Sequence, residues 1–215
     1  MNRESFSTGE HYHIYNRGTD KRNIFNDTND VSRFLKSMEL FNALEPIGSL
    51  YALTFERNEK AKKNLKQLVE IIAYCLNPNH YHFILRQKVN RGISEFMRRL
   101  NGGYTWYFNF KAKRTGYLFQ GPFKGKHIPN NDYLLRVSAY VNLNDKAHQL
   151  SGAAAKLVQS SWEEYTKGIK YLCKTDLILK QFSNRKRYEK FALEALPQML
   201  QRKKDEKELA SLMLE

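Results

Sequence analysis

The sequence predicts an α+β fold, in which helices pack on a mainly antiparallel sheet in a layout related to the ferredoxin-like fold. The first observation is the order of its segments, which alternate between β-forming and amphipathic patterns as β-α-β-β-β-α-β-α. The second is that 41% of the 215 residues are hydrophobic, enough for a packed core and too many for a disordered or collagen-like chain. This length fits one domain with an appendage, or two small domains.

The first part of the chain supplies a strand, a helix and three more strands. Residues His11 to Gly18 read as a strand that ends in a turn. Apolar residues at helical spacing predict a helix over Asp30 to Leu44, with Asn29 or Asp30 as its cap. Three further strands are expected at Leu50–Phe55, Ile71–Leu76 and His80–Leu85, with a Lys-rich loop over Arg57–Lys66 and a hairpin turn at Asn77–His80.

The next part returns to helical spacing. Apolar residues recur every three or four positions from Ile93 to Lys113, and Gly102-Gly103 inside this helix marks a break or a close backbone approach. A strand is expected over Tyr117 to Ile128. A helix from Tyr133 to Lys146 follows, and its start is signalled by Pro129 and the polar residues after it.

The composition changes after Ser151, where Lys- and Glu-rich text favours helices. This part carries 13 basic and 9 acidic residues. The sequence therefore predicts a main domain over residues 1–150 and a helical extension over residues 151–215.

The sequence also excludes some classes of protein. Cys75 and Cys173 are far apart and no charged-then-apolar leader follows Met1, so neither secretion nor a disulfide scaffold is indicated. No apolar run approaches the roughly 20 residues that span a bilayer, so no membrane partner is expected. We expect a cytoplasmic protein.

Positive charge is concentrated in the middle of the chain. Residues 1–50 carry 6 Lys and Arg and 7 acids, whereas Arg86 to Lys126 carries 10 Lys and Arg and a single acid. Interleaved cations and aromatic rings suit single-stranded nucleic acid, although a solvated helix face over an aromatic core would give the same composition. The residues expected to bind nucleic acid are Arg17, Arg98, Arg99, Tyr104, Lys111, Arg114, Lys124 and Lys126.

The sharpest chemical pattern is His80-Tyr81-His82 on a predicted strand. Because side chains alternate across a sheet, His80 and His82 share one face and stand about 7 Å apart, close enough to bind one divalent ion. Two incidental histidines on a strand would look the same. His11-Tyr12-His13 repeats the pattern, so spacing alone does not choose between the two pairs.

The helix expected after Pro129 adds a second set of candidates. Tyr140 and Asn144 are four residues apart, so a continuous helix would project both from one face. A tyrosine attacks a phosphodiester when a metal polarises the phosphate or a positive field stabilises the phenolate. Two imidazoles and an amide oxygen would leave open positions on Mg²⁺ or Mn²⁺. The alternative for Tyr140 is an ordinary core aromatic.

Several segments together resemble the REP-associated tyrosine transposases, the single-tyrosine branch of the HUH nucleases. The similarity spans about residues 9 to 165 and keeps the order and spacing of the segments. These segments read YHIYNRG, CLNPNHYHFIL, FMRRLNGGYTWYFNFKAKRTGYLFQGPFK, YLLRVSAYVNLN and SSWEEY.

The resemblance implies roles for specific residues. His80 and His82 would be the metal-binding pair of the HUH motif, Tyr140 the nucleophile and Asn144 the third ligand. Where the family has Asn-Pro, this chain has Asn144-Asp145, which makes Asp145 a further candidate oxygen ligand.

The same alignment of motifs bears on the other histidine pair and on function. It makes His11 and His13 strand residues rather than ligands. It implies a metal-dependent single-strand DNA endonuclease and strand transferase that forms a 5′-phosphotyrosine on hairpin-forming repeated DNA. No nucleotide cofactor is needed, because the tyrosyl bond conserves the phosphodiester energy. The alternatives are a nucleic-acid-binding module of the same fold without cleavage, and a replication-initiating or conjugative nicking enzyme, which the lack of a P-loop disfavours.

Overall fold

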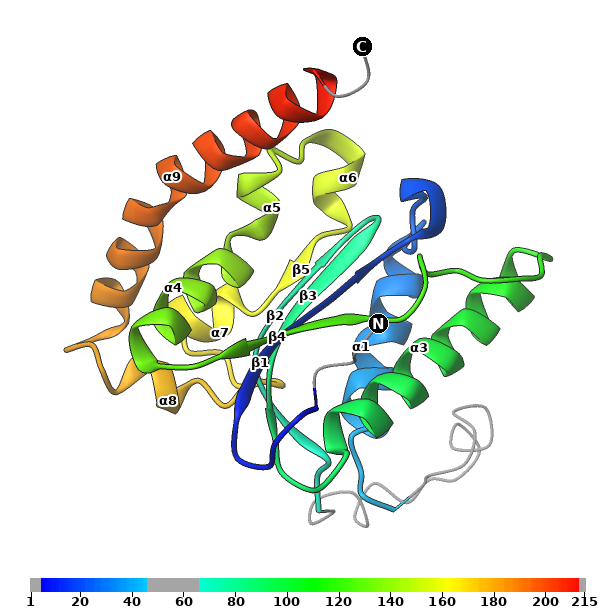
Figure 1. Ribbon diagram of the computed structural model, residues 1–215, viewed down its shortest axis with the longest axis horizontal. Helices are drawn as coiled ribbons and strands as arrows, with labels where there is room; N and C mark the ends of the chain where they lie inside the picture. Colours follow the sequence, from blue (N-terminus) through cyan, green and yellow to red (C-terminus); the bar gives the residue numbers. More distant parts are fainter. Residues whose placement is uncertain (1–4, 46–65, 213–215) are drawn as a thin grey trace.

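A five-stranded antiparallel sheet forms the centre of the molecule, and helices cover both of its faces (Figure 1). The computed structural model describes residues 5–45 and 66–212. The strand order is β4-β1-β3-β2-β5. The strands are β1 (His11–Arg17), β2 (Val69–Asn77), β3 (His80–Gln87), β4 (Lys124–Ile128) and β5 (Gln159–Ser160). The helices are η1 (Thr19–Lys21), α1 (Thr28–Leu40), α3 (Gly92–Lys111), α4 (Asn131–Asn142), α5 (Asn144–Ala147), α6 (Gly152–Lys156), α7 (Trp162–Thr166), α8 (Asp176–Leu179) and α9 (Arg185–Leu212).

The alternation of side chains along β3 divides the interior into two cores. Tyr81, Phe83 and Leu85 belong to a core that α1 and α3 cover. Ile84 belongs to a second core on the opposite face, under α4, α7 and α9. The predicted α+β fold with a mainly antiparallel sheet is therefore confirmed, and the H-x-H pattern lies on the face of α4.

The predicted hairpin of the second and third described strands is also confirmed. β2 and β3 pair antiparallel with Asn77 opposite His80, so Pro78 and Asn79 form the turn. The carbonyl of Pro78 accepts hydrogen bonds from the backbone N–H groups of Ile24 and Phe25, which fixes the turn to the chain before α1.

The strand expected over Tyr117 to Ile128 is wrong in its first half. Only Lys124–Ile128 forms β4, and a single bridge joins Phe119 to Gly18. Gly121 adopts a φ of +72°, and Pro122 has no backbone N–H to donate to a ladder. Leu118 and Phe119 are instead buried in the first core.

The two helices on this side differ from expectation in detail. The Asp27 side chain caps α1 by accepting a hydrogen bond from the N–H of Asp30, in place of the expected Asn29 or Asp30 cap, and α1 ends at Leu40. α3 continues through Gly102-Gly103 without a break. A Cβ at Gly103 would lie 2.7 Å from the Phe41 ring, so this glycine permits a close approach of α3 to the chain after α1.

Two expectations lie outside the described residues. They are the strand at Leu50–Phe55 and the Lys-rich loop over Arg57–Lys66, of which only Lys66 is described.

Residues 151–212 are mainly helical, but they also complete the sheet and the second core. β5 pairs with β2, and Tyr165 and Tyr188 are fully buried under the sheet. α9 lies along α4 and α7 (Figure 1). No helix in the described part of the chain has the length and apolar character required to cross a bilayer.

Candidate functional site

The two histidines of the H-x-H pattern lie next to each other on the face of β3 that α4 covers. The ring centroids of His80 and His82 are 5.3 Å apart, and the ring planes are nearly perpendicular. His82 is buried and His80 is half-buried. The strand therefore presents two imidazoles to one small region between the sheet and α4.

Hydrogen bonds fix the tautomer of His80. Its Nδ1 lies 2.6 Å from Oδ1 of Asn79, an atom that only accepts, so Nδ1 carries the proton. Nε2 is then a lone-pair acceptor and receives a hydrogen bond from Nδ2 of Asn77 at 2.9 Å. This arrangement leaves Nε2 as the atom suited to bind a metal.

Asn144 brings an oxygen to the same atom. Its Oδ1 accepts a hydrogen bond from Nδ2 of Asn77 and lies 3.0 Å from Nε2 of His80. Two acceptor atoms thus face each other in a buried place, an arrangement that a cation between them relieves. The Nδ2 atom of Asn144 is buried without a hydrogen-bond partner among the described residues.

This donor set fits a divalent metal with mixed nitrogen and oxygen ligands. Among the described residues no three His, Cys, Asp or Glu side chains are arranged so that they could hold a metal ion together, so the amide oxygen of Asn144 is the third ligand that geometry offers. Asp145, the further candidate, lies beside the buried thiol of Cys75, where burial and then the Asp145 charge raise the pKa of that thiol.

His13 joins this site from β1, although the sequence interpretation made it only a strand residue. It is a strand residue, but its ring stacks on that of His82 at 5.1 Å. Nε2 of His13 lies 2.9 Å from Nδ1 of His82, so one of these atoms donates to the other. His13 therefore orients the His82 ring.

The three imidazoles are neutral at neutral pH. Burial lowers the pKa of both His13 and His80 to about 4, and it lowers the pKa of His82 well below its ordinary value. His11 lies opposite Arg86, and burial followed by this cation lowers its pKa. Neutral rings keep the lone pairs that metal binding requires.

Tyr140 is half-buried on α4, and its ring stands over the same histidines. Its centroid is 5.5 Å from His82 and 5.9 Å from His13, with the Tyr140 ring at 83° to each. The expected continuous helix through Asn144 is wrong, because α4 ends at Asn142 and Leu143 leaves helical geometry before α5 begins. This break turns the backbone between the tyrosine and the amide.

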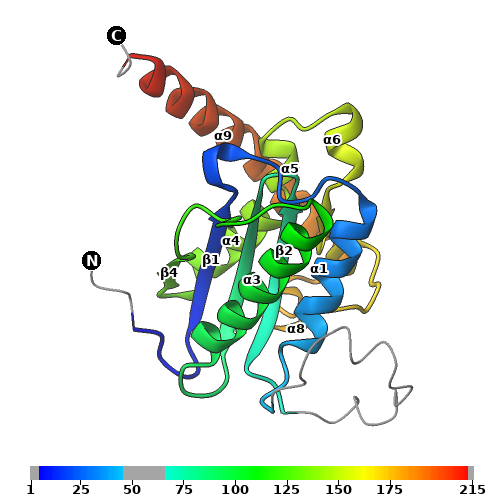
Figure 2. The same ribbon diagram turned by 90° about the vertical axis from the view of Figure 1, so that its right-hand side faces the viewer.

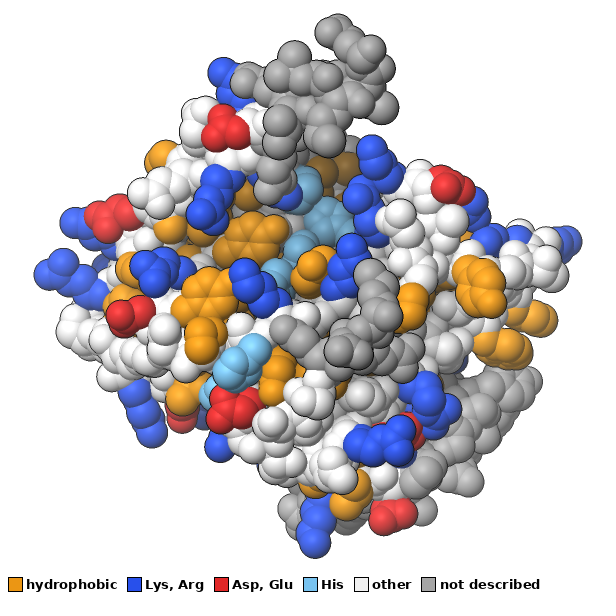
Figure 3. All heavy atoms as spheres, viewed as in Figure 1, with side chains coloured by type: hydrophobic (Ala, Val, Ile, Leu, Met, Phe, Trp, Pro, Cys, Tyr) orange, Lys and Arg blue, Asp and Glu red, His pale blue; other side chains and the backbone are white. Residues whose placement is uncertain are grey.

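Three of the residues predicted to bind nucleic acid lie on this face. Arg17 is opposite His80, Lys126 is opposite His13, and Lys124 is opposite Tyr15. All three cations are exposed. Figure 3 shows recessed histidine side chains with Lys and Arg side chains around them. The site therefore has a positive border suited to phosphate.

The other predicted nucleic-acid residues belong to α3 and the loop after it, on the opposite face of the sheet (Figure 1). Arg98 and Arg99 both bind Glu95, and Arg99 also donates to two backbone carbonyls. Lys111 pairs with Asp27 and Asp30, and Arg114 donates to Asn109 and to the carbonyl of Tyr117. These cations have structural partners in the protein.

Tyr104 does not form a stacking surface. It is fully buried, and its hydroxyl donates to the carbonyl of Ile24 at 2.5 Å. The aromatic-core interpretation of α3 therefore holds for Tyr104, because its ring is inaccessible to a base.

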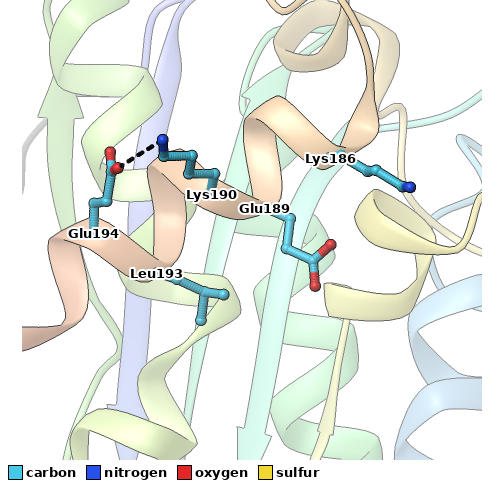
Figure 4. A pocket seen from close by; sticks show the side chains of 5 residues that line it. All are labelled: Lys186, Glu189, Lys190, Leu193 and Glu194. Atoms are coloured by element: carbon cyan, nitrogen blue, oxygen red, sulfur yellow. Dashed lines mark ion pairs between the residues drawn. The ribbon is translucent and has the colours of Figure 1, made fainter.

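A shallow hollow on the outer side of α9 lies apart from the histidines. It is lined by Lys186, Glu189, Lys190, Leu193 and Glu194 (Figure 4). Lys190 and Glu194 form an exposed ion pair there. Exposed charges of both signs on one helix give this hollow no chemistry comparable to that of the histidine site.

Sequence reasoning did not place His13, Asn77, Asn79 and His148 at the site. The centroid of the His148 ring is 4.7 Å from that of His80. Strand alternation puts His13 on the face opposite Tyr12, but its contact with His82 depends on the register of β1 against β3. That register is a long-range property that local patterns do not contain.

Comparisons with known proteins bear on the family resemblance and on the fold. Residues 56–144 match the family model described as "Transposase IS200 like". A solved structure described as a REP-associated tyrosine transposase bound to a REP hairpin aligns with a TM-score of 0.51 at 14% sequence identity. The alignment covers 80% of this chain and 88% of that chain. No curated protein sequence matches the chain. The predicted resemblance is thus confirmed, in sequence over residues 56–144 and in fold over most of the chain.

Proposed function

We propose that this protein is a metal-dependent single-strand DNA endonuclease and strand transferase with Tyr140 as its nucleophile. The observation that carries the proposal is the position of the Tyr140 ring over the histidine face, next to the facing acceptors of His80 and Asn144. The match to the IS200-like transposase model and the fold of the similar structure support it.

The residues that would hold Mg²⁺ or Mn²⁺ are His80, His82 and Asn144. When bound, the ion supplies Lewis-acid polarisation of the scissile phosphate. Asn79 holds the proton of His80 on Nδ1 and His13 orients His82, so both rings are positioned before substrate arrives. Arg17, Lys124 and Lys126 attract the phosphates that flank the reacting one.

The chemical step is a transesterification. Tyr140 Oη forms a bond to phosphorus while the bond from phosphorus to the 3′ oxygen breaks, and the phenolic proton ends on that oxygen. The products are a 5′-phosphotyrosine and a free 3′-OH. Attack by another 3′-OH reverses the step and rejoins the strand without a nucleotide cofactor.

The proposed substrate is hairpin-forming repeated DNA with an unpaired flank. The similar solved structure is described as bound to a REP hairpin, and we propose the same class for this chain. The alternative is a nucleic-acid-binding module of the same fold. Such a protein would bind this DNA but would not cleave it.

A covalent adduct tests the proposal. The protein is incubated with Mn²⁺ and single-stranded DNA from the flanks of its own gene, and the adduct is located by mass spectrometry. We expect the nucleotide on Tyr140, no adduct with Tyr140→Phe, and a normal adduct with Tyr171→Phe, a change at an exposed tyrosine elsewhere. A nucleotide on Tyr133 or another tyrosine would overturn the assignment, and DNA binding without any adduct would favour the binding module.

A further inference from the structure

The end of α3 and the loop after it carry large aromatic side chains that face solvent. Trp106 is 62% exposed, Phe110 is 75% exposed and Tyr117 is 85% exposed. Trp106 and Phe110 stand one helical turn apart, and their rings are nearly parallel at 5.6 Å. We call these three side chains the aromatic patch. Exposed rings in a group indicate a binding surface rather than ordinary surface composition.

The loop after α3 places the third ring of the patch. Asn109 donates a hydrogen bond to the carbonyl of Gly116 and accepts one from Arg114, which also binds the carbonyl of Tyr117. These bonds fold the loop back on the end of α3, where Phe110 lies. Hydrogen bonds within the protein thus fix the position of the loop that carries Tyr117.

The surroundings of the patch are cationic. Asp27 and Asp30 pair with Lys111, the residue after Phe110, but Lys113 and Arg114 follow closely, and the sequence has no Asp or Glu between Glu95 and Asp132. Lys113 is exposed. In Figure 3 hydrophobic side chains gather over the end of α3 at the right-hand margin, with Lys and Arg side chains beside them. Positive charge at this surface favours a polyanionic ligand over a protein partner that has few acidic residues.

The chain continues from the patch toward the histidine site. Residues 112–123 link α3 to β4, which is an edge strand, and Figure 2 shows this link crossing from α3 to the edge of the sheet. On β4, Lys124 and Lys126 lie on the side of Tyr15 and His13. Cations therefore stand at both ends of this link, with Lys113 and Arg114 beside the aromatic patch and Lys124 and Lys126 on the face of Tyr140.

We propose that the aromatic patch binds unpaired bases of the DNA strand by stacking, outside the reacting phosphodiester. The strand then passes from Lys113 and Arg114 over the link to Lys124 and Lys126 of β4, and so to Tyr140. This inference rests on the proposed function, since it names a second contact of the same substrate. In this proposal the ligand of the exposed Trp106 and Phe110 rings is a nucleobase.

The chain has two tryptophans, so replacing one of them lets intrinsic fluorescence report on the other alone. In a Trp162→Phe background Trp106 is the single emitter. Single-stranded DNA added without divalent metal should quench this emission, and an oligonucleotide of equal length with abasic positions should quench it much less. Because no divalent metal is present, the DNA can bind without being cleaved. The fluorescence change therefore does not depend on the chemistry of Tyr140.

Affinity gives the second readout. Trp106→Ala and Phe110→Ala should each weaken binding of single-stranded DNA at least about fivefold. The matched control is Tyr171→Ala, which removes a 54% exposed ring elsewhere on the surface. Circular dichroism and thermal unfolding check that each variant is folded.

The outcomes separate the two proposals. Unchanged affinity and unquenched Trp106, with a normal Tyr140 adduct, overturn the stacking contact and leave the proposed function standing. Quenching without any adduct supports the contact and overturns the proposed chemistry. A change of Trp106 emission that depends on protein concentration and needs no DNA assigns the patch to a second copy of the chain and overturns the inference.

Discussion

The orientation of His80 depends on the residue beside it in the chain. Asn79 accepts the Nδ1 proton of His80 and also donates to the carbonyl of Lys21, which anchors the turn between β2 and β3. A single amide oxygen thus determines which nitrogen of the ring faces Asn144.

Removing that oxygen should weaken metal binding more than folding. We expect Asn79→Ala to lower the affinity for Mn²⁺ by about 10- to 100-fold, because the lost acceptor frees the ring and its tautomer. Asn79→Asp keeps an acceptor and should retain affinity. Isothermal titration of both variants with Mn²⁺ measures the difference, and equal loss in the two would show that the amide oxygen has no such role.

Glu95 gives a prediction on pH. The hydrogen bond from Arg98, followed by that from Arg99, lowers the pKa of Glu95 to about 2 from 4.5. A depressed pKa stabilises the folded state above the unfolded value, and that stability is lost as the pH falls from 4.5 toward 2. Because Glu95 is partly exposed, we expect a contribution on the order of 1 kcal/mol.

Chemical denaturation across this range tests the contribution. Glu95→Gln should be less stable than the original chain at neutral pH, and the gap should close as the solution becomes acidic. A gap that stays constant with pH would assign the effect to packing instead of charge.

Among the elements, α4 is held in place by a buried polar network. Nδ2 of Asn142 donates to the hydroxyl of Tyr188 on α9, and Oδ1 of Asn142 accepts from Ser161, which also accepts from the N–H of Tyr74 on β2. This network joins the helix of Tyr140 to the sheet and to α9, so the tyrosine is positioned by residues from the C-terminal part of the chain.

Removal of one hydroxyl from this network should lower the stability of the folded protein. Tyr188→Phe leaves the buried Asn142 amide without its acceptor, and we expect a loss of about 1–3 kcal/mol in the free energy of unfolding. Tyr171→Phe, at an exposed site, should change it by less than about 0.5 kcal/mol. Urea denaturation compares the two variants, and equal effects would count against the network.

Local pattern predicted the elements better than their junctions. The alternation of His80 and Ile84 with buried aromatics sufficed to place the H-x-H pair on one face. The break at Leu143 carries neither Gly nor Pro, so no residue in the sequence announces it. The strand expected from Tyr117 is not formed, because Leu118 and Phe119 enter the core from a loop. A buried loop segment and a strand can have the same apolar composition, so the sequence pattern does not separate them.

At the scale of the whole molecule, the basic segment divides between the two faces of the sheet. Arg98 and Arg99 have an acidic partner in Glu95, whereas Lys124 and Lys126 lie on the Tyr140 face at the edge of the sheet. Composition predicted a cationic protein, but it did not reveal which cations are already neutralised by neighbours.

The salt dependence of DNA binding should reflect this division. Affinity for single-stranded DNA should fall with salt at a slope of about −0.7 per phosphate contact. Lys124→Glu with Lys126→Glu should weaken binding across sequences and make the slope shallower, while Arg98→Gln should change it little. Fluorescence anisotropy at several salt concentrations measures the slopes, and an affinity independent of salt would indicate a partner other than nucleic acid.

The position of β3 as the middle strand of the sheet has a consequence for the energetics of metal uptake. β3 has β1 and β2 on its two sides, so we expect its backbone to open only when the whole sheet unfolds. Amide hydrogens of His80 and His82 should therefore be among the slowest to exchange with deuterium, with or without an ion. If His80 and His82 are the ligands, as proposed, they are preorganised, so binding of the ion should proceed without coupled folding and with a heat-capacity change near zero.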